Sequence, residues 1–65
     1  MTNAEVVVLF VVLEQGAMLP ELLFARAKAK NICDTYSLDA AILSLRAQRL
    51  LVPDEKTGKL RRGHP

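Results

Sequence analysis

The residue types that carry out catalysis or bind metals are few in this chain of 65 residues. Cys33 and His64 are the only soft metal ligands, and their separation matches no zinc-binding spacing. The segment TGK at residues 57–59 lacks the glycine spacing of a phosphate-binding loop. No second cysteine is present to form a disulfide within the chain. We therefore expect no enzymatic activity, no metal site and no cofactor.

Basic residues gather at the C-terminal end of the chain. Up to Leu45, five acidic residues outnumber three basic ones, whereas from Arg46 onward six basic residues face two acidic ones. Such asymmetry is typical of a segment that binds an anion, often nucleic acid, although it is also found in merely solvated tails. The candidate nucleic-acid contacts in this segment are Arg46, Arg49, Lys56, Lys59, Arg61 and Arg62.

Residues 3–15 are expected to form a helix that is apolar on every side. Thr2 and Glu5 have the spacing of a capping box, and Gly16 suits the position just past a helix end. The valines of this segment also suit a strand, but the capping signals and the length favour a helix. Because such a helix must be covered all round, we expect part of it to lie in a homodimer interface. The candidate interface residues on this helix are Val8, Leu9 and Val12.

The sequence contains no segment that is expected to direct the chain to a membrane. Its N-terminus lacks the positive charges of a signal peptide. The longest apolar run, residues 6–13, is far shorter than the roughly 20 residues that span a bilayer. A lone cysteine fits a reducing compartment. We expect a cytoplasmic protein without a membrane partner.

Two further helices are expected, over residues 20–30 and 38–50. Pro20 suits the first turn of the one and Ser37 the N-cap of the other. Between them we expect a turn, in which Asn31 adopts a left-handed conformation. The two residues that follow it, Ile32 and Cys33, are expected to enter the core.

The remaining residues are expected to form a β-hairpin over residues 51–62, followed by a frayed tail at residues 63–65. Pro53 cannot donate to a strand ladder, so it ends the first strand or lies at an edge. Gly58 provides a positive φ in the turn, and Leu60 faces inward on the second strand. The fold class is therefore mainly α with a small β-hairpin, in a single domain over residues 1–65.

This order of three helices and a basic hairpin, together with the phrase AAILSLRAQRLLVPDEKTGKL, resembles the winged helix-turn-helix family. Residues 17–19 can supply the short first strand of such a domain. The resemblance implies binding to double-stranded DNA, with the third helix in the major groove and the hairpin, as the wing, near the backbone. Carried over to this chain, it places Thr35, Tyr36 and Ser37 where the third helix meets the groove.

The outward face of the third helix departs from that pattern. It presents Asp39, Ala40, Leu43 and Ala47, rather than the Arg, Lys, Asn or Gln that usually read base edges. Two hypotheses follow. The first is a small dimeric DNA-binding protein, such as a transcriptional regulator, held mainly by phosphate contacts of the wing. The second is a non-catalytic protein-interaction module of the same fold, docking through Leu43 and Ala47 or through the helix at residues 3–15.

Overall fold

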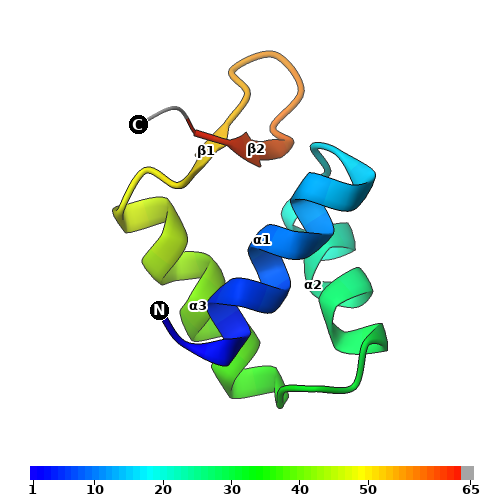
Figure 1. Cartoon of the computed structure of the whole chain (residues 1–65). Coiled ribbons are helices and arrows are strands. Elements are labelled where there is room, and N and C mark those ends of the chain that lie inside the picture. The colour runs from blue at the N-terminus through cyan, green and yellow to red at the C-terminus, as the bar shows by residue number, and fades with distance from the viewer. Residues whose placement is uncertain (64–65) are drawn as a thin grey trace.

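The computed structural model describes residues 1–63 and contains three helices followed by a two-stranded antiparallel hairpin (Figure 1). The elements are α1 (Asn3–Gln15), α2 (Pro20–Ala29), α3 (Thr35–Ala47), β1 (Leu51–Pro53) and β2 (Leu60–Arg62). The expected mainly helical fold with a small hairpin is confirmed at this level. Of the tail that was expected to fray, Gly63 is instead held by a hydrogen bond from its amide to the Leu50 carbonyl, and His64 and Pro65 lie outside the described residues.

Both ends of α1 follow the local signals in the sequence. The Thr2 hydroxyl accepts a hydrogen bond from the Glu5 amide (3.2 Å), and the Glu5 carboxylate accepts one from the Thr2 amide (3.0 Å). This reciprocal pair is the predicted capping box. At the other end Gly16 has a φ of 87° and donates its amide to the Val12 carbonyl at 2.8 Å. The capping box and the role of Gly16 are confirmed.

The start of α3 differs from the prediction. Asp34, not Ser37, is the N-cap: its Oδ1 accepts the Ser37 amide at 2.8 Å. Asp and Ser are comparable N-cap residues, so the sequence alone did not discriminate between them. Capping at Asp34 adds a turn to the helix and places a carboxylate at the positive end of its dipole. The three predicted groove contacts, residues 35–37, therefore form the first turn of α3.

The end of α3 also differs, because the helix stops at Ala47 rather than at residue 50. Arg49 adopts a left-handed conformation (φ 63°) and donates its amide to the Arg46 carbonyl at 3.1 Å. The Leu50 amide bonds to the Leu45 carbonyl at 2.9 Å. These two bonds are those of a Schellman motif, which closes a helix by satisfying its last carbonyls. The chain leaves α3 in a sharp turn that leads into β1.

The hairpin joins the helices through an additional pairing. Within it, Leu51 faces Arg62, Val52 faces Arg61 and Pro53 faces Leu60. Met18, in the link between α1 and α2, exchanges both backbone hydrogen bonds with Leu60, at 3.2 and 2.7 Å. The link at residues 17–19 thus contributes an extended residue beside β2, as expected. Asn31 also has the expected left-handed conformation, with a φ of 56°.

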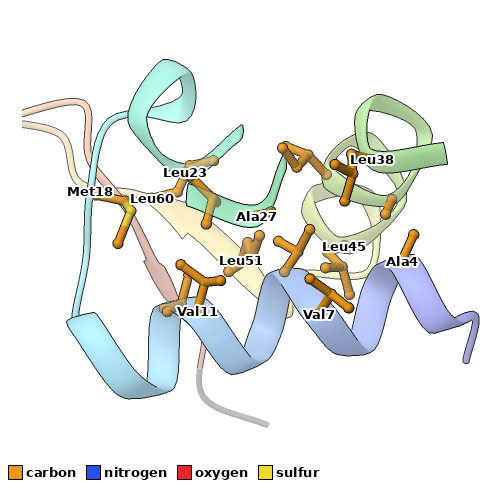
Figure 2. Packing of buried hydrophobic residues seen from close by; sticks show 14 residues of the cluster. Ala4, Val7, Val11, Met18, Leu23, Ala27, Leu38, Leu45, Leu51 and Leu60 are labelled. Atoms are coloured by element: carbon orange, nitrogen blue, oxygen red, sulfur yellow. The ribbon is translucent and has the colours of Figure 1, made fainter. Parts of the chain in front are cut away.

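All five elements contribute side chains to one core, with α1 packed against α2, α3 and β2 (Figure 2). The core residues are Ala4, Val7, Val8, Val11, Val12, Met18, Leu23, Ala27, Leu38, Ala41, Ile42, Leu45, Leu51 and Leu60. Leu60 is fully buried, as predicted. The prediction for the turn after α2 is wrong in part, because Ile32 is 63% exposed and only Cys33 packs against the core, partly buried. The one-turn extension of α3 toward its N-terminus leaves Ile32 on the surface.

Candidate nucleic-acid interface

An open hollow of about 1190 Å³ lies between the C-terminal half of α3 and the hairpin. Figure 1 shows how the hairpin stands at the end of the molecule beyond the last turn of α3. We call this hollow the basic groove. It is lined by Leu43, Arg46, Ala47, Arg49, Leu51, Val52, Pro53, Asp54, Glu55, Lys56, Arg61 and Gly63.

The basic groove brings together four of the six predicted basic contacts. Arg46 lies in the last turn of α3, Arg49 in the turn that follows, Lys56 in the hairpin loop and Arg61 on β2. The other two, Lys59 and Arg62, do not line it. Two acids, Asp54 and Glu55, also border the groove, so its cations outnumber its anions. A hollow lined by an excess of one sign of charge attracts partners of the opposite sign.

Gly63 holds the end of the hairpin close to the last turn of α3. Its amide donates to the Leu50 carbonyl at 2.9 Å. A Cβ at this position would collide with the carbonyl oxygen of Arg49, so only glycine fits without a shift of the backbone. This close approach sets the position of β2, and hence of Arg61, relative to Arg49.

The hairpin loop is organised by Asp54. Its Oδ1 accepts the amides of Lys56 (2.8 Å) and Thr57 (3.2 Å), and its backbone carbonyl accepts the amide of Gly58 (2.8 Å). Gly58 has the positive φ that the sequence predicts (73°). The amides of Lys56 and Thr57 lower the pKa of Asp54, with a further contribution from the nearby cations of Arg61 and Lys59. This acid is therefore engaged in the turn and balances part of the positive charge.

Strand alternation turns the side chain of Arg61 away from the core. Leu51 and Leu60 are fully buried on the core side, and the paired residues Val52 and Arg61 point to the opposite face. Arg61 is therefore turned away from the core and toward the groove. Arg62 lies opposite Leu51 on β1 and is exposed.

The outer face of α3 is an uncharged stripe. Tyr36, Ala40, Leu43 and Ala47 are spaced by four, three and four residues, which places them on one side of the helix. The opposite side is the buried one. Tyr36 is 82% and Leu43 66% exposed. The predicted protein contacts Leu43 and Ala47 therefore lie on the surface, and they also line the basic groove.

Thr35, Tyr36 and Ser37 lie at the other end of α3 from the basic groove. About 11 residues separate Tyr36 from Ala47, which corresponds to about 16 Å along a helix. Tyr36 and Ser37 line a separate hollow, of about 630 Å³, against the N-terminal turn of α1. Seven of the nine predicted nucleic-acid residues therefore form two groups, joined by the uncharged stripe, while Lys59 and Arg62 line neither hollow.

The predicted dimer contacts on α1 require correction. Val8 and Val12 are 0% and 5% exposed, because they belong to the core cluster of this same chain, and Leu9 is partly buried. The exposed apolar residues of α1 are instead Val6, Phe10 and Leu13. A helix without a polar face gives no sequence signal for the side that faces the core. Packing alone therefore determines which side of α1 faces the core.

Within residues 1–63, no group of three or more metal-binding side chains gathers, and no helix is long and apolar enough to cross a bilayer. The candidate site consists of cations and an apolar stripe, which can bind a polyanion or a protein surface. Comparison of the chain with protein-family models, with curated proteins and with solved structures finds no match.

Proposed function

We propose that the chain is a small DNA-binding domain of the winged-helix type, acting as a transcriptional regulator. The main support for the proposal is that one groove is lined by Arg46, Arg49, Lys56 and Arg61. Three of these come from the hairpin or the turn before it, and they meet only in the folded chain. Duplex DNA is a regular polyanion whose phosphates a groove of this kind can follow.

The order of the elements supports the winged-helix assignment. Three helices precede a hairpin, and the link between α1 and α2 pairs with the second hairpin strand through Met18. In this interpretation α3 is the helix that approaches the major groove and the loop around Lys56 is the wing. Tyr36 and Ser37 would then meet the DNA with the first turn of α3.

We propose that phosphate contacts supply most of the affinity and that sequence discrimination is weak. The stripe on α3 offers apolar contact to thymine methyl groups but no bidentate donor to a purine. Asp39, which is exposed beside it, repels phosphate. Backbone contacts position a protein on DNA without reading its sequence. We therefore expect similar affinities for duplexes of different sequence.

Titration with duplex DNA at low and moderate salt tests this proposal. Binding is expected to weaken steeply as salt rises, because each neutralised phosphate releases counterions. The groove variant Arg49→Gly/Arg61→Ala is expected to bind more weakly and to reduce the slope of log K against log salt by about 2, one unit for each lost contact. Absence of binding by the wild-type chain at low salt would refute the proposal.

A charge-matched control separates the groove from general basicity. Lys59→Ala/Arg62→Ala removes the same number of positive charges from residues that do not line the groove. We expect this variant to keep most of the affinity. An equal loss in both variants would mean that net charge alone holds the DNA, and the assignment of the groove would fail.

A second candidate function rests on Leu43, which is 66% exposed at the centre of the uncharged stripe. A leucine exposed to this degree beside four cations fits an amphipathic protein segment with acidic residues along its edges. In that case DNA affinity is negligible even at low salt, and Leu43→Glu disrupts the protein complex. The same DNA titration therefore discriminates between the two candidate functions.

A further inference from the structure

The basic groove contains apolar side chains that phosphate contacts leave without a role. Of the residues of α3, those that line the groove are Leu43, Arg46 and Ala47. Leu43 is 66% exposed, and Ala47 is exposed as well. Neither apolar side chain has a donor for a phosphate oxygen. Toward the groove, α3 therefore presents two apolar side chains and one cation.

The charges around Leu43 differ between its two sides. On one side Leu43 borders a separate hollow of about 500 Å³, whose lining includes Glu21 and Asp39. On the other side it borders the basic groove, where the only acids are Asp54 and Glu55 of the hairpin. Because four cations outnumber these two acids, the groove side of Leu43 suits a polyanion that carries apolar groups close to its charges.

Duplex DNA offers one apolar group of this kind. In the major groove each base pair presents hydrogen-bond donors and acceptors, and thymine alone adds an apolar group, its C5-methyl. Apolar side chains such as that of alanine contact this methyl group in protein–DNA complexes. Building on the proposed function, we infer that Leu43, with Ala47 beside it, packs against thymine methyl groups. The cations of the groove hold the phosphates of the same duplex.

The dimensions of α3 and of the major groove are compatible with this contact. An α-helix with its side chains is about 10–12 Å across, and the major groove of B-DNA is about 12 Å wide. Leu43 and Ala47 are four residues apart, which is about 6 Å along a helix, and successive base pairs are about 3.4 Å apart. When α3 lies along the groove, the two side chains reach base pairs about two steps apart. One or two methyl groups are then covered, which gives a small preference beside the affinity from phosphate contacts.

Replacing thymine by uracil in the duplex tests the inference, because it removes only the C5-methyl group. A duplex of A·T pairs is compared with the same duplex of A·U pairs, so that a methyl group is present at every register of the first. The two duplexes share their phosphates and the hydrogen-bonding groups of the major groove, so contacts of the arginines are the same in both. The wild-type chain is expected to bind the thymine duplex about fourfold more tightly for each methyl group that is covered.

Two leucine variants assign the preference to the groove. Leu43→Ala is expected to bind the uracil duplex as the wild type does and to lose most of the preference for thymine. The matched control Leu13→Ala removes the same atoms from a leucine that is 59% exposed on α1 and does not line the groove, and it is expected to keep the preference. Neither variant is expected to change the salt dependence, because neither side chain contacts a phosphate. Circular dichroism establishes that both variants are folded.

A second pair of duplexes separates the methyl group from the shape of A·T DNA. A G·C duplex with 5-methylcytosine is expected to bind more tightly than its unmethylated counterpart, because the added methyl group also lies in the major groove. A gain with thymine alone would restrict the contact to thymine. Equal affinities within both pairs, or a thymine preference that Leu43→Ala retains, would overturn the inference and leave the proposed function standing. Absence of binding to every duplex would instead count against the proposed function itself.

Discussion

At the scale of single residues, Glu5 has a role that extends beyond the helix it caps. One carboxylate oxygen accepts the Thr2 amide, while the other accepts Ser44 Oγ and Gln48 Nε2, which are themselves joined at 2.9 Å. The hydrogen bond from the Thr2 backbone is the main reason that the pKa of Glu5 lies below its ordinary value of 4.5, and those from Gln48 and Ser44 act in the same direction. The carboxylate thus ties the start of α1 to the end of α3.

The acid sensitivity of the fold follows from this lowered pKa. A carboxyl group that binds its proton less readily when folded stabilises the fold above its unfolded pKa, and this stabilisation is lost as the pH falls through the folded pKa. The pKa values of Asp34 and Asp54 are also lowered, by the hydrogen bonds from Ser37 and from the amides of the loop. Wild-type stability is therefore expected to fall as the pH drops from about 5 toward 3.

Glu5→Gln tests the contribution of this carboxylate. The variant is expected to be less stable than the wild type at pH 7, because an amide offers one acceptor oxygen where the carboxylate offers two. It is also expected to lose less stability between pH 5 and pH 3 than the wild type, since about one titrating group has been removed. Urea unfolding at several pH values measures both. Parallel pH profiles for the two proteins would show that Glu5 does not contribute.

At the scale of elements, the turn that ends α3 determines where the groove cations lie. The Schellman motif requires a left-handed residue, and here that residue is Arg49. A left-handed conformation costs a residue with a Cβ about 1–2 kcal/mol, whereas glycine adopts it freely. An arginine at a position that favours glycine supplies a charge at some cost in stability.

Arg49→Gly is therefore expected to leave the free energy of unfolding unchanged or to raise it by up to about 1 kcal/mol. The same variant is expected to weaken DNA binding, because a groove cation is lost. Urea unfolding and the DNA titration together check the two effects. A clear loss of stability would mean that the arginine side chain makes contacts that hold the turn.

Gly63→Ala tests the docking of the hairpin against that turn. The added Cβ meets the Arg49 carbonyl oxygen, so the backbone must move apart. We expect a loss of about 1–3 kcal/mol, the usual range for forced overpacking. Amide exchange at residue 63, whose amide bonds to the Leu50 carbonyl in the wild type, is expected to be faster in the variant. Unchanged stability and exchange would show that the hairpin is not held at this point.

At the scale of the whole molecule, the fold is stabilised by one small hydrophobic core. A domain of 65 residues has a stability of about 3–10 kcal/mol. Leu45 is fully buried in the last turn of α3 and packs in the cluster shown in Figure 2. Removing a single large core side chain therefore costs a substantial fraction of the total free energy of unfolding.

Leu45→Ala is expected to cost about 2–5 kcal/mol and to leave the chain partly or wholly unfolded at 37 °C. The control is Leu43→Ala, two residues away and 66% exposed, which is expected to change stability by about 0.5 kcal/mol or less. Thermal unfolding, monitored by circular dichroism, compares the stabilities of the two variants. Similar effects at the two positions would contradict the assignment of the inner and outer faces of α3.

Local chemistry allowed much of this fold to be predicted from the sequence. The capping box at Thr2 and Glu5, the left-handed Asn31 and the turn at Gly58 depend on neighbours within a few residues, so their signals are contained in short segments. The start of α3 was misplaced because Asp34 and Ser37 are both good caps. Its end was misplaced because a left-handed arginine has no local signal.

The sequence by itself determined the element order, the caps of α1 and the basic C-terminal end of the chain. Only the tertiary structure decided that Arg46, Arg49, Lys56 and Arg61 share a groove while Lys59 and Arg62 do not. Strand register sets the directions of Arg61 and Arg62, and the turn after α3 positions Arg49. The tertiary structure also decided that α1 buries Val8 and Val12 and exposes Val6, Phe10 and Leu13. A helix that is apolar all round is oriented by its packing partners, and these are distant in sequence.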